Sequence, residues 1–163
     1  VRDGMRAVLD RHGYRNAHVT IDNSDWYVDN RLKERLKRDP ATDLEPWRRF
    51  YLGHLWERAT YYDGLARALG LHGIDHTLLV HHRLTTGLFL GDALAMFAER
   101  GWRLVDAEQA FAAPLFERRP DVLPAGQSLI WSLAKESGRF EGQLRYPGED
   151  GDYEKARMDA LSL

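Results

Sequence analysis

The longest regular pattern in the sequence is a helical repeat of apolar and aromatic residues between positions 44 and 69. At 1.5 Å per residue this helix is roughly 39 Å long. Pro46 falls in its first turn, where proline is tolerated, and Gly70 and Gly73 end it. The residues recurring at helical spacing are Trp47, Phe50, Tyr51, His54, Leu55, Arg58, Tyr62, Leu65 and Leu69. The pattern predicts one long helix as the main element of the chain.

Three short apolar runs alternate with predicted helices. The runs cover residues 17–21, 77–82 and 102–105, and turn-forming residues bound them, which is typical of short buried strands. The predicted helices cover residues 3–12, 29–40, 88–100 and 107–112, in addition to the long one. Alternating strands and helices indicate an α/β fold with a parallel sheet. After residue 112 we expect a loop, a short helix capped by Ser128 and an extended C-terminal tail.

Composition excludes several classes of protein. The 163 residues include 23 Lys and Arg against 25 Asp and Glu, a net charge of −2, which argues against nucleic acid as the main partner. The chain has no cysteine, so disulfides, thiolate metal sites and a cysteine nucleophile are excluded. No apolar run is long enough to predict a membrane span. The length is that of one domain, although the start at Val1 suggests a fragment or a processed chain.

Polar side chains follow the first two predicted strands. Asp25 and Trp26 come just after the strand at 17–21, and His81 ends the strand at 77–82. Enzymes with parallel strands place their chemistry at the C-terminal ends of those strands. A carboxylate and an imidazole at one rim are suited to proton transfer. The alternatives stay open: Asp25 as a turn or cap residue, His81 as an ordinary strand-end histidine, and Trp26 as core.

Other polar groups are weaker candidates. His72 and His76 have the spacing of a helical two-imidazole metal site, but Gly73 and Asp75 disfavour a helix there, so solvated loop histidines are the simpler interpretation. Residues 145–148, RYPG, are interpreted as an exposed turn rather than an anion site. The basic run at residues 31–38 is interpreted as the solvated face of a helix.

The two strand ends resemble motifs of the NodB-type polysaccharide deacetylases, carbohydrate esterase family 4. The segment VTIDNSDW at residues 19–26 is similar to the family's Asp-Trp motif. The segment LLVHH at residues 78–82 is similar to its Leu-x-His motif. The stretch LGD at residues 90–92 followed by GWRLVDAEQA at residues 101–110 resembles the family's last helix and strand. The resemblance covers roughly residues 5–111, and the residues from 123 onward look like an extension found in some members.

The resemblance implies a fold, a reaction and site residues. Residues 1–112 are similar to the C-terminal half of a (β/α) deacetylase barrel, with residues 113–163 as loop, short helix and tail. The implied reaction is metal-dependent removal of acetyl groups, N-acetyl above all, from an amino-sugar glycan. His81 is then the general acid that protonates the leaving amine, and Asp25 pairs with an arginine that positions the catalytic carboxylate. Trp26 and Leu79 wall the acetyl pocket.

The family's other motifs are absent from this chain. The Thr-Phe-Asp-Asp-Gly motif with the base, the His-Ser/Thr-x-x-His motif with two metal ligands and the Arg-x-Pro-Tyr motif do not occur. The chain is therefore expected to lack the ligands of the divalent metal, often zinc, and to be completed by an N-terminal half or a second chain. Family members of this kind suggest a location outside the cytoplasm.

Two other functions remain open at this stage. The chain could be a catalytically incomplete homologue that binds a glycan or a protein through the rim that carries Trp26. Ranked last is an unrelated metal hydrolase that uses His72, His76 and His81.

Overall fold

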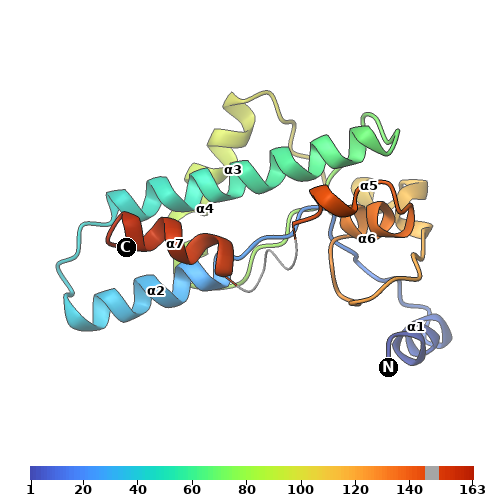
Figure 1. Cartoon of the computed structure of the whole chain (residues 1–163), viewed down its shortest axis with the longest axis horizontal. Coiled ribbons are helices and arrows are strands. Elements are labelled where there is room, and N and C mark those ends of the chain that lie inside the picture. Colours follow the sequence, from blue (N-terminus) through green and yellow to red (C-terminus); the bar gives the residue numbers. More distant parts are fainter. Residues whose placement is uncertain (146–150) are drawn as a thin grey trace.

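The computed structural model describes residues 1–145 and 151–163, and their regular structure is helical. Tyr146, Pro147 and Gly148 of the predicted exposed turn lie outside the described residues. None of the described helices is long and apolar enough to cross a membrane. Figure 1 shows their arrangement: α1 (Arg2–Arg11), α2 (Asp25–Arg38), α3 (Glu45–Ala68), α4 (Leu84–Glu99), α5 (Ala107–Phe111), α6 (Leu129–Glu136) and α7 (Asp152–Ala160), with 3₁₀ turns η1 (Pro114–Glu117) and η2 (Glu141–Gln143).

The prediction of an α/β fold, and of part of a barrel, is wrong for the described residues. The runs at 17–21 and 77–82 are extended, but they share only one isolated parallel bridge, between Ile21 and Leu78. The Ile21 amide donates to the Thr77 carbonyl at 2.9 Å, and the Leu79 amide donates to the Ile21 carbonyl at 3.0 Å. The run at 102–105 forms no strand. An apolar run predicts an extended buried segment, but a strand also needs a ladder of partners, which the described residues do not supply.

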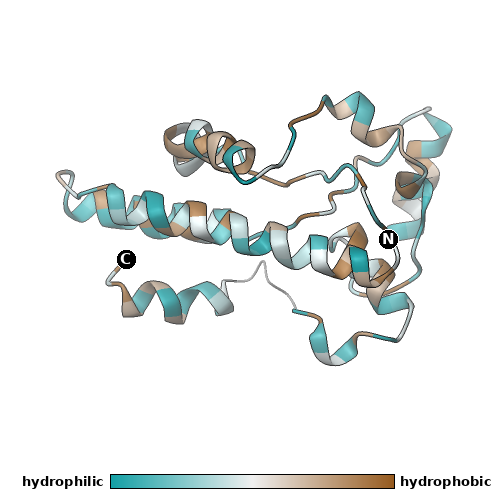
Figure 2. Cartoon of the chain, turned by 90° about the horizontal axis from the view of Figure 1, so that it is seen from above, coloured by the Kyte–Doolittle hydropathy of each residue, from teal (hydrophilic) through white to brown (hydrophobic). Residues whose placement is uncertain are grey.

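Helix α3 is the scaffold of the molecule and agrees with the long helix predicted for residues 44–69. It packs against α2, α4 and α6. Tyr51, Leu55 and Tyr62 on its apolar face are fully buried. Burying each such side chain contributes about 1.5–3 kcal/mol. Figure 2 shows the largely apolar α4 on one side of α3 and the more polar α7 on the other.

Helices α2 and α4 begin earlier than their local sequences predict. Asp29, expected to cap α2, lies inside it, and the helix begins at Asp25. The buried Asp29 carboxylate instead accepts a hydrogen bond from the Thr85 amide at 2.9 Å and pairs with Lys33 at 2.7 Å. It therefore satisfies a donor at the start of α4, a helix that was expected to begin at residue 88. Because this cap for α4 comes from a residue of α2, the sequence around the start of α4 does not predict it.

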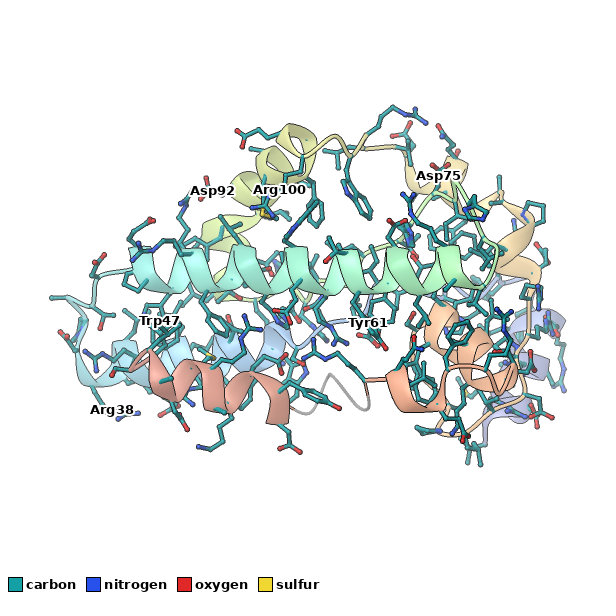
Figure 3. The ribbon with its side chains drawn as sticks, turned by 45° about the horizontal axis from the view of Figure 1, so that its top comes forward. Arg38, Trp47, Tyr61, Asp75, Asp92 and Arg100 are labelled. Carbon is teal, nitrogen blue, oxygen red and sulfur yellow. The ribbon has the colours of Figure 1, made fainter. Side chains whose placement is uncertain are left out.

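The expected extended tail contains a packed helix instead. Met158 of α7 is fully buried, and Asp159 pairs with Arg31 of α2 at 2.6 Å. The segment leading toward α7 is anchored where the Arg145 amide donates to the Tyr61 hydroxyl at 2.9 Å. Figure 3 shows Tyr61 projecting from α3 on the side where α7 lies. The predicted short helix capped by Ser128 is confirmed, since the Ser128 side chain accepts from the Trp131 amide.

Substitution of Gly151 tests the docking of α7 directly. Gly151 has φ +86°, and a Cβ there would lie 2.7 Å from Cγ of Tyr27. Gly138 is a matched control, with φ +67° and no atom within 4 Å of the same position. Both alanine variants incur about 1–2 kcal/mol for left-handed backbone. We expect Gly151→Ala to cost about 1–3 kcal/mol more in urea unfolding, because Tyr27 must move. Equal losses in the two variants would contradict the packing of α7 on α2.

Candidate functional site

The Asp25 and His81 side chains meet at one end of the two bridged segments. The parallel bridge joins Ile21 to Leu78, so the residues that follow each of them emerge at the same end. Asp25 is the first residue of α2, and His81 lies three residues before α4 begins. The sequence-based expectation that these two residues lie together agrees with the structure, although one bridge rather than a sheet joins their segments.

His81 engages both oxygens of the Asp25 carboxylate. Its backbone amide donates to Oδ2 at 2.7 Å, and its ring Nδ1 donates to Oδ1 at 2.6 Å. The Asp25 side chain is 0% exposed, whereas that of His81 is 39% exposed. The His81 carbonyl in turn accepts from Oγ1 of Thr86 at 2.7 Å. Backbone and ring of His81 are thus fixed together, and its Nε2 is on the ring edge away from the carboxylate.

This arrangement is suited to proton transfer at Nε2 of His81. A carboxylate that accepts from Nδ1 fixes the tautomer of the imidazole and stabilises its protonated form. An imidazole gains and loses a proton near neutral pH, so it can serve as a general acid or base. The buried Asp25 and the half-exposed His81 therefore form a dyad with one end toward solvent. No arginine pairs with Asp25 among the residues that the structure describes.

The loop before Asp25 is held by its own polar side chains. The Asp25 amide donates to Oδ1 of Asn23 at 2.8 Å, and Nδ2 of Asn23 donates to the Leu79 carbonyl. Asn23 thus ties the segment before α2 to the segment before His81. Asp25 also sits in the first turn of α2, where the helix dipole favours a negative charge.

Helix α3 holds the same loop through two buried polar side chains. Nε2 of His54 accepts a hydrogen bond from the Ser24 amide at 3.1 Å. Nε of Arg58, one turn further on, donates to the Asp22 carbonyl at 3.2 Å. Neither residue was predicted as functional, yet both fall on the apolar face of the long helical pattern. Polar side chains on an apolar face are the signal that could have identified them.

Burial shifts the pKa of His54 and the pKa of the carboxylate beside it. Burial, reinforced by the positive charges of Arg58, Arg157 and Arg145, lowers the pKa of His54 to about 3. His54 is therefore neutral at pH 7. Burial also raises the pKa of Glu154, whereas Arg58 and Arg145 oppose that rise.

The predicted pocket residues Trp26 and Leu79 lie beside the dyad in sequence. Trp26 is half-buried and packs edge-on against Tyr27, with ring centroids 5.8 Å apart. Leu79 is half-buried, and its backbone bonds Ile21 and Asn23. Their role as walls of an acetyl pocket stays a prediction.

The histidines considered as metal ligands do not converge. His72 is exposed, whereas His76 is half-buried, with Nδ1 3.0 Å from Oγ1 of Thr20 and its ring 5.6 Å from that of Trp102. Nε2 of His76 faces Asp63 at 3.6 Å, and Nδ1 of His81 is bonded to Asp25. Within residues 1–145 and 151–163, no three His, Asp or Glu side chains are grouped to hold a metal ion. The residues present do not fit the divalent metal that the resemblance implies.

Comparison with protein families, curated proteins and solved structures finds no match to this chain. The likeness to the deacetylases is thus carried by the motifs at residues 19–26, 78–82 and 90–110 alone.

The low pKa of His54 predicts an acid-dependent loss of stability. The unfolded chain binds a proton at this residue below about pH 6.5, whereas the folded chain does so only near pH 3. The free energy of unfolding therefore falls as the pH drops through this range. His54→Gln removes the titration and keeps an acceptor oxygen near the position of Nε2, which accepts from the Ser24 amide. Between pH 7 and pH 4 we expect the wild type to lose about 3 kcal/mol more than this variant in urea unfolding.

His82→Gln is the control, because His82 is exposed and this variant should lose as much stability as the wild type. Glu154 titrates with the opposite sign: its raised pKa gives stability below about pH 4.5 that is lost as the pH rises. Glu154 is present in both proteins, so to first order it cancels in the comparison. Parallel losses in the wild type and His54→Gln would contradict the assignment of a neutral buried His54.

Proposed function

We propose that this chain carries the proton-transfer side of a polysaccharide deacetylase-like hydrolase. The substrate class is an acetylated amino-sugar glycan, and the bond cleaved is the N-acetyl amide. The observation that carries the proposal is the contact of Asp25 with His81, since these are the polar residues of the two segments that resemble the family motifs. Their contact supports the interpretation of the two segments as parts of one site.

The chemistry follows from the fixed ring of His81. An amine leaves a tetrahedral intermediate poorly unless it is protonated, and Nε2 of His81 would deliver that proton. Asp25 holds the ring in place and stabilises the imidazolium. Trp26 and Leu79 would contact the acetyl methyl group.

The remaining chemistry would come from other residues. In the family, a divalent metal polarises the acetyl carbonyl and activates water. Because the described donors do not fit a metal, we propose that an N-terminal half or a second chain supplies that part of the site. On this proposal the isolated chain is inactive.

A binding role is the second candidate. Trp26 is partly exposed and adjoins the dyad, and an aromatic ring at such a rim provides a flat apolar surface for a sugar or a protein partner. Under this alternative the chain recognises a glycan without cleaving it.

Substitution of His81 in the completed enzyme tests the first proposal. With the metal-bearing part present and an N-acetylglucosamine oligomer as substrate, we expect His81→Gln to lower kcat about 10²–10⁴-fold, with little change in KM. His82→Gln is the matched control, because His82 is the next residue in the chain and its side chain is exposed. This variant should keep kcat within about threefold of the wild type. Acetate release measures both rates.

A loss under tenfold in His81→Gln would remove His81 from the role of general acid. If the completed wild-type protein releases no acetate and Trp26→Ala abolishes oligomer binding, the binding role is favoured instead.

A further inference from the structure

A second carboxylate–imidazole pair lies at the interface between α3 and α7. His54 and Glu154 are 1% and 0% exposed, and Nδ1 of His54 faces Oε1 of Glu154 at 3.5 Å. Glu154 lies 100 residues after His54 in the chain, so α7 must be docked for the pair to exist. The site described above uses His54 only as the acceptor of the Ser24 amide.

The hydrogen bond from Ser24 dictates where the His54 proton is. A neutral imidazole has one donor and one acceptor nitrogen. Since Nε2 accepts from the Ser24 amide at 3.1 Å, the proton must be on Nδ1. The other tautomer would set two N–H donors against each other and break the contact. Glu154 is the carboxylate that Nδ1 faces at 3.5 Å, so a proton on Nδ1 lies on the side of this carboxylate.

The groups around the pair keep the Glu154 carboxylate in place. Arg58 and Arg145 act on it with positive charge, and Nη2 of Arg145 lies 3.9 Å from Oε1. The Ser24 side chain also lowers the pKa of this carboxylate. Glu57 pairs with Arg157 and also with Arg145, at 3.2 Å. A buried carboxylate near Arg58 and Arg145, with an imidazole at its edge, is a specific arrangement rather than a solvated helix face.

We propose that Glu154 is a positioning residue for the Asp25–His81 dyad and acts through His54. Glu154 holds the proton of His54 on Nδ1, Nε2 then holds the Ser24 amide, and Ser24 is the residue that directly precedes Asp25. The C-terminal helix thereby sets the geometry of a proton-transfer group located elsewhere in the chain. The consequence for catalysis rests on the proposed function, whereas the coupling itself does not.

Nitrogen-15 NMR of the histidine rings in this chain, without substrate, tests the coupling of Glu154 to Ser24 through His54. In the wild type we expect His54 in the Nδ1–H tautomer at pH 7. Glu154→Gln keeps an acceptor oxygen and should preserve that tautomer. Glu154→Leu removes the acceptor, so we expect a mixed tautomer, amide exchange of Ser24 at least tenfold faster, and loss of the protected Nδ1 proton of His81. Met158→Ala loosens a buried contact of the same helix and should leave the His54 tautomer unchanged.

Two results would overturn the proposal. One is an Nε2–H tautomer of His54 in the wild type, which needs no variant to fold. The other is a folded Glu154→Leu variant whose His54 tautomer and Ser24 protection match the wild type. Because no substrate is present, failure here leaves the deacetylase proposal standing, and an inactive completed enzyme leaves the coupling standing.

Discussion

The buried carboxylate of Asp25 is the group on which the arrangement of the site depends. Removing a carboxylate from water is expensive unless both of its oxygens find donors. One residue, His81, supplies those donors from its backbone and its ring. The two extended segments must therefore stay together even though only a single bridge, Ile21 to Leu78, joins their backbones. The same contact that offsets the free-energy cost of burying Asp25 also fixes the ring of His81.

Helix α3 supplies the rigid support for this contact. Its apolar face builds the core, and on that face His54 and Arg58 reach the backbone on either side of the loop before Asp25. Helix α7 closes over His54 with Glu154. The two carboxylate–imidazole pairs therefore differ in burial. The buried pair contacts the backbone of Ser24, and the other includes the half-exposed side chain of His81. Burial gives His54 a structural role, and partial exposure leaves His81 accessible for the chemistry that we propose.

Local sequence predicted the elements that depend on local physics. The apolar spacing from Trp47 to Leu65 defined α3, and Ser128 capped α6 as expected. Apolar runs could not distinguish a paired strand from an extended segment, since pairing depends on partners elsewhere. The cap that Asp29 gives to α4 and the burial of Glu154 were equally invisible, because both arise between helices distant in sequence. Asp25 and His81 were predicted to meet, and they do; their role in catalysis stays a prediction.

The central claim, that Asp25 fixes His81 for proton transfer at Nε2, is tested most directly by the tautomer of His81. Ring nitrogen-15 NMR at a pH where the imidazole is neutral reports which nitrogen carries the proton. The account predicts a protonated Nδ1 with slow exchange against water, and an Nε2 free to accept a proton. A predominant Nε2–H tautomer, or an Nδ1 proton that exchanges as fast as that of an exposed histidine, would contradict it.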